Sequence, residues 1–330
     1  MEGLLARRRA FHYRGAVMDN IFRIGTRGSR LALIQSNWIA GRLRDAHGQL
    51  EIRIETFRTA GDRDRATPLA HLPGIGFFVK ELEEALLDDR IDLAVHSLKD
   101  VPTVLPEGLE VAAAVPERED PRECLITPQG LPLDQLPQGA TIGSSSPRRR
   151  AMLLAARPDL KFIDLRGNVE TRLTKLEAGV CDATVLARAG LSRMGLLDKR
   201  MVVVEPNIIT PPAGQGALGL EFRDSDAGVR RVLAVLDHAP SRLAVTAERA
   251  LLARLGAGCR TPLGVLGRVD AAGTLTLDAY LAAPDGHEAI RRQATGKAAD
   301  AAQIAAALAL ALLEAGAGRY VCPEGEGGEG

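Results

Sequence analysis

The sequence predicts an α/β fold built from two α/β units, with a small α+β domain at the C-terminus. Its length of 330 residues suits two or three domains. Segments with strand and helix periodicity alternate up to about residue 116 and again beyond it, which indicates mixed, largely parallel sheets. From residue 241 the pattern changes to one helix, two strands and a final helix, so a third domain is expected there.

Composition excludes several classes of protein. Apolar residues make up 46% and charged residues 25%, as in folded globular chains, which excludes wholesale disorder. Lys plus Arg and Asp plus Glu both total 42, so the chain lacks the basic excess of a general nucleic-acid binder. The longest apolar run, 304–313, is too short to cross a bilayer, and no membrane partner is expected.

The cysteines indicate the compartment. The four cysteines are far apart, with no paired spacing and no nearby histidine pair. A structural metal site and a disulfide framework are both disfavoured, so we expect no metal and a reducing cytoplasm.

The first unit begins with a short strand at 21–25. Ser29 is placed to cap a helix over 31–43, and 51–57 alternates apolar and polar residues as a half-buried strand does. Residues 60–76 break all periodicity, which is typical of a long loop that acts as a lid. A helix is expected at 77–87.

A buried strand at 91–95 leads into the polar segment 96–100. Ligands of α/β sheets bind beyond the carboxyl ends of the strands, so this segment is a candidate site by its position alone.

The second unit follows a linker-like stretch at 116–121. Its expected strands are 123–127, 141–143, 161–165 and 183–187. Ser146 and Pro147 open one helix, and Asn168 caps another at 169–178. The Pro- and Gly-rich stretch 208–219 is expected to cross back to the first unit. In the C-terminal domain we expect helices at 243–255 and 300–315 and strands at 263–269 and 274–282.

The segment SSSPRRR at 144–150 is the first candidate anion site. Hydroxyls and free backbone N–H groups at a helix start bind anions, and arginine forks fit carboxylates or phosphates. Cations at a helix N-terminus oppose the helix dipole, so three of them there indicate a function. The alternative is an ordinary capped helix with a solvated basic first turn.

Further arginines follow other strands. Arg27 ends the first strand, and Arg166 and Arg172 lie where the strand at 161–165 meets the next helix. Each alone is typical of a surface residue, but together they predict a cleft for a polyanionic small molecule.

Two further residues could react. Asp100 at a strand end beside this cleft suits acid–base chemistry or the stabilisation of a cation, with Lys99 keeping it ionised. The alternative is a surface Lys–Asp turn. Cys259 in a glycine-containing loop beside Arg260 could be a reactive thiol, or a small buried apolar residue. No phosphate-loop or dinucleotide motif is present, so nothing supports nucleotide binding.

Nine segments occur together in one order: RIGTRGSRLAL (23–33), FFVKELEEALL (77–87), DLAVHSLKDVP (92–102), EREDPRE (117–123), GSSSPRRR (143–150), LRGNVETRL (165–173), AGLSRMGL (189–196), PAGQGALGLE (212–221) and ERALLARLGAGCRTPLG (248–264). Through these the chain resembles the hydroxymethylbilane synthase (porphobilinogen deaminase) family over nearly its whole length. The resemblance implies two lobes like those of type II periplasmic binding proteins and a small α+β C-terminal domain. The domain bounds it suggests are 1–19 for an N-terminal extension expected to be disordered, 20–116 with 216–238 for lobe 1, 117–215 for lobe 2, 239–322 for the C-terminal domain and 323–330 for a disordered tail.

The resemblance also implies the reaction. Four porphobilinogen molecules are joined head to tail with loss of ammonia to give the linear tetrapyrrole hydroxymethylbilane. The chain grows on a dipyrromethane cofactor, which is itself made from substrate and is linked through a thioether to the cysteine matching Cys259. Asp100 matches the catalytic carboxylate, which would stabilise the cationic azafulvene left when ammonia departs. The positions matching cofactor- or substrate-binding residues are Arg27, Ser29, Phe78, Ser97, Lys99, Ser144, Ser145, Ser146, Arg148, Arg149, Arg166, Arg172 and Arg193.

The lid departs from the family pattern. Ile75 and His71 stand where lysines are common, so the lid carries less charge. A non-catalytic two-lobed module that binds a polycarboxylate is the alternative function, and the expected oligomeric state is a monomer.

Overall fold

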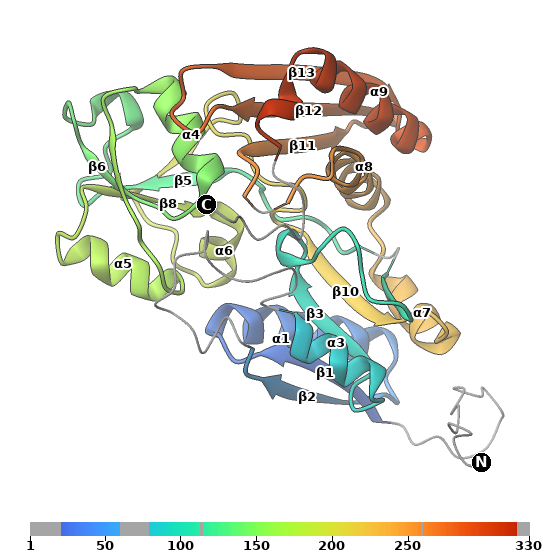
Figure 1. Cartoon of the computed structure of the whole chain (residues 1–330). Coiled ribbons are helices and arrows are strands. Elements are labelled where there is room, and N and C mark those ends of the chain that lie inside the picture. The colour runs from blue at the N-terminus through green and yellow to red at the C-terminus, as the bar shows by residue number, and fades with distance from the viewer. Residues whose placement is uncertain (1–20, 60–78, 113–114, 259, 322–330) are drawn as a thin grey trace, which may run out of the picture.

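The computed structural model describes residues 21–59, 79–112, 115–258 and 260–321 (Figure 1). The expected lid at 60–76, the N-terminal extension at 1–19, the tail at 323–330, Phe78 and Cys259 lie outside the described residues.

The first five-stranded sheet has the order β2-β1-β3-β10-β4. Its strands are β1 (Ile21–Arg27), β2 (Glu51–Phe57), β3 (Leu93–Ser97), β4 (Leu109–Val111) and β10 (Leu218–Arg223). β1 pairs in parallel with β2 and β3, whereas β10 runs antiparallel to β3 and β4. The chain therefore returns to this sheet after the second unit, as the Pro- and Gly-rich stretch predicted.

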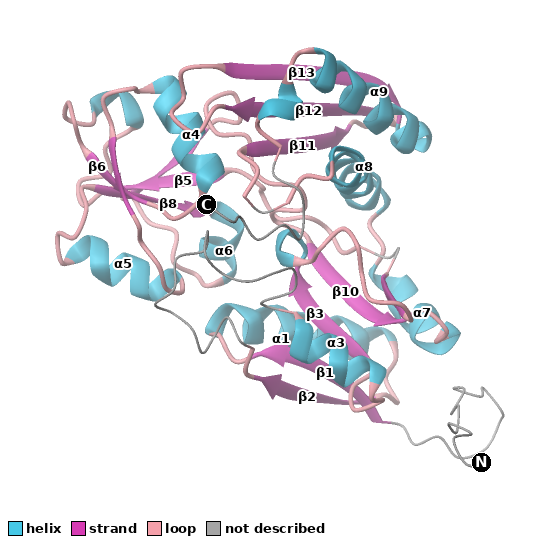
Figure 2. Cartoon of the chain, in the orientation of Figure 1, coloured by secondary structure: helices cyan, strands magenta, loops and turns pink. Residues whose placement is uncertain are grey.

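Helices cover both faces of this sheet (Figure 2). They are α1 (Arg30–Ala46), α3 (Lys80–Leu87) and α7 (Ala227–Leu233), with 3₁₀ turns at Leu98–Asp100 and Ala234–Leu236. Ser29 caps α1 as predicted, and its Oγ accepts a hydrogen bond from the Ala32 backbone N–H. α1 buries Ile39 and Leu43 against β1 and β10, and α3 buries Leu82 and Leu86 near the start of β3.

The second sheet has the order β7-β6-β8-β5-β9. Its elements are β5 (Glu123–Ile126), β6 (Thr141–Gly143), β7 (Lys161–Ile163), β8 (Ala183–Ala187), β9 (Met201–Val204), α4 (Pro147–Ala156), α5 (Val169–Glu177) and α6 (Arg188–Arg193), with a 3₁₀ turn at Leu133–Gln135. β6 pairs in parallel with β7 and β8, and β5 pairs antiparallel with β8 and β9. Both sheets are mixed in the same way, with the antiparallel strand in the fourth position, so the two lobes share one topology.

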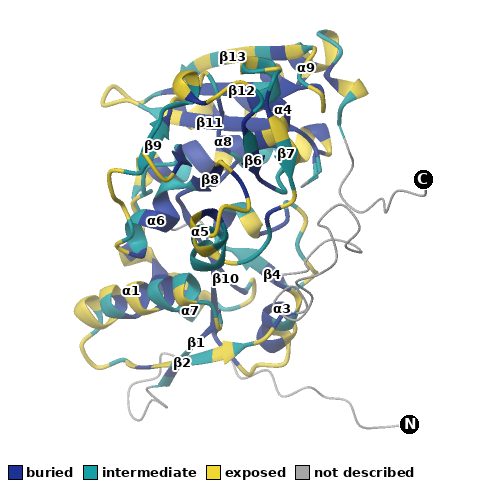
Figure 3. Cartoon of the chain, turned by 90° about the vertical axis from the view of Figure 1, so that its left-hand side faces the viewer, coloured by how far each residue is buried: buried dark blue, intermediate teal, exposed yellow. Residues whose placement is uncertain are grey.

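The C-terminal domain packs two helices on an antiparallel sheet of order β11-β12-β13 (Figure 1). Its elements are α8 (Ala239–Leu255), β11 (Leu263–Val269), β12 (Thr274–Ala282), β13 (Ala289–Lys297) and α9 (Ala301–Glu314), with 3₁₀ turns at Ala298–Asp300 and Ala317–Arg319. α8 begins before the predicted residue 243 because Pro240 fits the first helical turn. The sequence did not predict β13, whose residues are mostly exposed or half-buried (Figure 3).

Glu248 of α8 connects the C-terminal domain to both segments that cross between the lobes. Its two carboxylate oxygens accept from Arg118 Nη1 at 2.7 Å and Nη2 at 3.1 Å. They also accept from the backbone N–H of Gly214 at 2.6 Å and of Gly267 at 2.7 Å. Glu248 is fully buried, so one carboxylate binds both crossings and β11 in a place that water does not reach.

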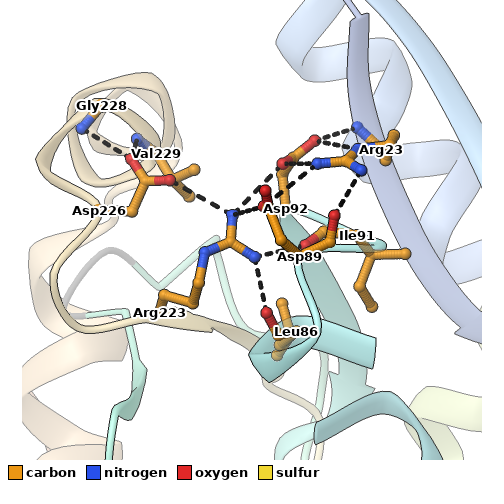
Figure 4. Close-up of polar contacts among 9 residues, drawn as sticks. All are labelled: Arg23, Leu86, Asp89, Ile91, Asp92, Arg223, Asp226, Gly228 and Val229. Carbon is orange, nitrogen blue, oxygen red and sulfur yellow. Dashed lines mark hydrogen bonds and ion pairs between the residues drawn. The ribbon is translucent and has the colours of Figure 1, made fainter. Parts of the chain in front are cut away.

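An ion network lies at the other end of lobe 1, where β3 begins (Figure 4). Asp92 is buried and accepts from Arg23 Nε at 3.0 Å and Nη2 at 2.7 Å. Arg223 approaches the same carboxylate at 3.4 Å and reaches Asp226 at the start of α7. The network binds β1, β3, β10 and α7 together, away from the carboxyl end of β3.

Candidate active site

The carboxyl ends of β1 and β3 surround a cavity of about 80 Å³ in lobe 1. Its polar lining residues are Arg27, Ser29, Gln35, His96, Ser97 and Asp100. Three of these, Arg27, Ser29 and Ser97, were predicted as binding residues, and Asp100 was predicted as the reacting carboxylate. Asp100 is exposed at the end of the 3₁₀ turn that follows β3.

Gln35 is a site residue that the sequence analysis missed. It is buried in α1, and its Nε2 donates to Ser97 Oγ at 3.0 Å. An amide side chain on the buried, mainly apolar face of a helix is the signal that would have identified it.

The side chain of Lys99 contacts the crossing segment 208–219. Its Nζ donates to Gln215 Oε1 at 3.0 Å, and Gln215 Nε2 donates to the Pro121 carbonyl at 2.7 Å. Burial lowers the pKa of Lys99, and the charge of Asp100 opposes that shift. Lys99 therefore links the turn after β3 to both crossings.

The start of α4 forms the opposite wall, in lobe 2. Ser146 caps the helix, and its Oγ accepts from the Arg149 backbone N–H at 3.4 Å. Arg148 and Arg149 are buried, so the alternative of a solvated basic first turn is wrong for these two arginines.

Both guanidinium groups bind Glu123, the first residue of β5. Arg149 donates Nε at 3.1 Å and Nη2 at 2.8 Å to its carboxylate, and Arg148 donates through Nη2. Burial alone would raise the pKa of Glu123, but Arg149 and Arg148 outweigh it and hold that pKa well below its usual range. Glu123 was not among the predicted site residues, although a charged residue at the start of a buried strand is a signal of a buried ion pair.

Part of this polar cluster has no hydrogen-bond partner within the described part of the chain. Arg166 Nη1 and Ser145 Oγ are buried and have no hydrogen-bond partner among the described residues. Arg172 uses Nε to donate to the Gly167 carbonyl at 2.9 Å. Burial, together with the charges of Arg149 and Arg166, lowers the pKa of Arg172 to about 10, while Asp100 acts in the opposite direction. The charges of Asp100 in lobe 1 and of Arg149 and Arg166 in lobe 2 all act on Arg172, so these residues lie around one cleft.

Arg193 lies on the side of this cleft where the crossing segments connect the two lobes. Its Nη2 donates to the Gly216 carbonyl at 2.7 Å, so α6 is bound to the crossing segment. Burial lowers the pKa of Arg193, and the charge of Glu119 opposes the shift. Gly216 has φ of +87°, and a Cβ there would lie 2.4 Å from the Glu119 carbonyl oxygen, so only glycine fits.

The lobes also meet at an ion pair near the helix starts. Arg30 at the start of α1 donates to Glu170 at the start of α5 at 2.6 Å. Because both side chains are exposed, this pair contributes little to stability.

A buried acidic cluster lies between α3 and the sheet of lobe 1. His96 Nε2 contacts Glu221 Oε2 at 2.9 Å, and Glu83 of α3 is buried nearby. Burial and the charge of Glu221 raise the pKa of Glu83 from 4.5 to about 7, although His96 acts to lower it.

This shift predicts a pH-dependent stability. Because the folded pKa of Glu83 exceeds the unfolded value, folding takes up a proton, and its contribution is fully present below about pH 4.5 and lost as pH rises through about 7. Between pH 4.5 and pH 8, wild type is expected to lose up to about 3 kcal/mol more free energy of unfolding than Glu83→Gln does. Urea unfolding at several pH values measures this, with Glu84→Gln on the same helix as control. A constant difference between Glu83→Gln and wild type across this pH range would contradict the prediction.

The described residues contain no group of three or more His, Cys, Asp or Glu side chains placed to hold a metal ion. Nor do they include a helix that is both long and apolar enough to span a bilayer.

Fold and site together define a two-lobed α/β protein with a cluster of buried arginines in its second lobe. The sequence model of the family described as "Porphobilinogen deaminase, dipyromethane cofactor binding domain" matches residues 22–231, and that of "Porphobilinogen deaminase, C-terminal domain" matches residues 242–314. The chain belongs to the porphobilinogen deaminase family.

Curated relatives match 90–92% of this chain. The chain is 50% identical to the porphobilinogen deaminase of Desulforudis audaxviator (strain MP104C) over 298 residues, which are 90% of this chain and 96% of that relative. It is 45% identical to the porphobilinogen deaminase of Syntrophobacter fumaroxidans over 304 residues, covering 92% of this chain and 97% of the relative. The protein is thus a porphobilinogen deaminase of tetrapyrrole biosynthesis with a dipyrromethane-cofactor domain, and the alternative of a non-catalytic binding module is not favoured.

Solved structures match part of the chain. The methionine-binding protein MetQ aligns with a TM-score of 0.42 at 14% identity, over 70% of this chain and 94% of its own. The periplasmic VFT2 domain of Bordetella pertussis BvgS aligns with a TM-score of 0.39 at 13% identity, over 66% of this chain and 86% of its own.

Proposed function

We propose that this cleft joins four porphobilinogen molecules head to tail, with release of ammonia, to give the linear tetrapyrrole hydroxymethylbilane. The observation that carries the assignment of the binding site is the set of unpaired donors in lobe 2. Arg166 Nη1 and Ser145 Oγ are buried without a partner among the described residues, beside Arg172, which has no ion pair within that part of the chain. Buried donors of this kind are costly unless a ligand satisfies them.

Porphobilinogen has the chemistry that these donors fit. Each pyrrole carries an acetate and a propionate, and guanidinium groups bind carboxylates through paired hydrogen bonds. Arg149 keeps Nη1 for such a contact, because its Nε and Nη2 are already bound to Glu123. Both terminal nitrogens of Arg148 already donate within the protein, Nη1 to the Thr210 carbonyl and Nη2 to Glu123, so this residue has fewer donors for a ligand than Arg149.

The same donor set fits a dipyrromethane group, whose two rings carry the same carboxylates. The residues proposed to hold it are Ser144, Ser145, Ser146, Lys99, Arg148, Arg149, Arg166, Arg172 and Arg193, and Cys259 is proposed as the point of covalent attachment. When bound, this group supplies the pyrrole to which the first substrate is joined.

Substrate is proposed to react on the lobe 1 side. Asp100 is exposed in the cavity wall, where Arg27, Ser29 and Ser97 can position the incoming carboxylates and ring. Phe78 is proposed to stack near the incoming pyrrole. An ionised Asp100 stabilises the cationic fragment that remains when ammonia leaves, and it accepts the proton that ring coupling releases.

Intact mass tests this function. Wild type is expected to exceed its sequence mass by two porphobilinogen units less two ammonias, whereas Cys259→Ser is expected to show no excess. If wild type is unmodified, it is incubated with porphobilinogen and weighed again. A mass that stays unmodified, with no ammonia released, would contradict the proposal.

Three finer assignments accompany it. We propose the bounds given above for the two lobes and the C-terminal domain, because the crossings at 116–121 and 208–219 separate the two five-stranded sheets. Cys124 and Cys181 are free thiols, which supports a reducing cytoplasm. A monomer is proposed, and light scattering of the purified protein tests it.

A further inference from the structure

Three titratable side chains meet under α3, and the proposed mechanism uses none of them. His96 comes from β3, Glu221 from the adjacent β10 and Glu83 from α3. The side chain of His96 is 3% exposed and that of Glu221 is 0% exposed, and the two are in contact through Nε2 and Oε2. All three therefore lie in the interior of lobe 1.

As a purely structural element, this cluster would lower the stability of the fold. Glu221 Oε1 is buried and has no hydrogen-bond partner among the described residues, so only half of the carboxylate is satisfied. The surroundings are apolar, with Leu82, Leu86 and Ala94 packed between α3 and the strands. Well-packed apolar residues would be at least as stable there as a half-satisfied buried pair, so a function is the better account of it.

One cavity connects the His96–Glu221 pair with the carboxylate of Asp100. His96 and Asp100 both line the cavity of about 80 Å³, which has room for a bridging water. Glu221 occupies Nε2, and Nδ1 has no hydrogen-bond partner among the described residues. A ring that donates from Nε2 to Glu221 leaves Nδ1 as an acceptor.

We propose that His96 and Glu221, with Glu83 behind them, form a proton relay that acts through Asp100. This inference rests on the proposed role of Asp100. In each condensation the bond from the substrate methylene to the ammonium nitrogen breaks and ammonia departs. The methylene then bonds to the free α-carbon of the acceptor pyrrole, whose carbon–hydrogen bond breaks as the ring regains aromaticity.

The balance of one condensation is therefore one ammonia and one proton. The proton passes from carbon to the carboxylate of Asp100 and then, through a water, to Nδ1 of His96. The imidazolium that forms is stabilised by Glu221, and transfer to solvent through the cleft resets the relay. His96 and Glu221 are positioning residues, because Asp100 alone meets the reacting atoms.

The charged groups around the relay come from several elements. α3 contributes Glu83, and its neighbours Lys80 and Glu84 act on the charge of Glu83 together with Glu221 and His96. The turn after β3 contributes Lys99 and Asp100, and the end of β1 contributes Arg27. α1 faces the cavity with the neutral Gln35.

The first test compares Glu221→Gln with Asp92→Asn. Both remove one buried carboxylate charge from the same sheet, but Asp92 lies at the far end of β3, in the network of Figure 4. Glu221→Gln is expected to lower kcat by about 10- to 100-fold, leave KM within about twofold, and change the pH profile of kcat. Asp92→Asn is expected to lower stability without moving that profile. Wild-type kcat and pH profile in folded Glu221→Gln, or the same change of profile in Asp92→Asn, would overturn the relay.

The second test does not depend on turnover. The ¹⁵N chemical shifts of the His96 ring in the cofactor-free protein report which nitrogen carries the proton, with His96→Gln used for assignment. The relay requires the Nε2–H tautomer in the neutral ring, and an Nδ1–H tautomer would overturn it. Because this is read from the resting protein, its failure is distinct from a failure of the proposed function, which the intact mass reports.

Discussion

Asp100→Asn is expected to lower kcat by at least about 100-fold while the fold and the arginine cleft persist. Removing a preorganised charge that stabilises a developing ion costs this much in other active sites. Asp100 is exposed in the cavity wall, so its amide isostere should change the free energy of unfolding by no more than about 0.5 kcal/mol. Ammonia release measures kcat, and urea unfolding measures stability.

The control for this prediction is Asp45→Asn. Asp45 is an exposed carboxylate near the end of α1, and it does not line the cavity. This variant should keep wild-type turnover. Turnover near the wild-type rate in Asp100→Asn would remove Asp100 from the mechanism, and with it the proton route through His96.

Glu248→Gln is expected to lower the free energy of unfolding by about 3–5 kcal/mol, which is the cost of breaking a buried ion pair. The guanidinium of Arg118 would lose its counter-charge in a place where its side chain is only 8% exposed. The new amide group would also direct N–H donors at partners that are themselves donors, among them the Gly214 and Gly267 backbone N–H groups. The loss should appear in denaturant unfolding and as a fall of about 10 °C in Tm.

Glu314→Gln at the end of α9 is the matched control, because this carboxylate is exposed. It should leave stability within about 0.5 kcal/mol of wild type. A loss below about 1 kcal/mol in Glu248→Gln would show that the crossings are held by other contacts.

Much of the fold could be predicted locally. Ser29, Ser146 and Asn168 cap helices as expected, because side-chain capping depends on the neighbouring three residues. β4, β9, β10 and β13 were not predicted. β4 and β9 are short and β13 is largely exposed, so none of these three has a strong pattern of its own. β10 is longer and mostly buried, but it follows directly on the Pro- and Gly-rich stretch. Pairing with distant strands determines all four.

The candidate site, like the fold, could be predicted from the sequence only in part. The sequence by itself determined which residue types follow the strands, because strand ends and helix starts are local features: arginines and serines in lobe 2, and Asp100 in lobe 1. Only the tertiary structure decided which of them are already satisfied. Glu123 meets Arg148 and Arg149 from 25 and 26 residues away, Gln35 meets Ser97 across 62, and Glu221 meets His96 across 125. Such partners are selected by packing in three dimensions, where burial makes an unpaired charge or amide costly, and that cost is not visible in the order of residues along the chain.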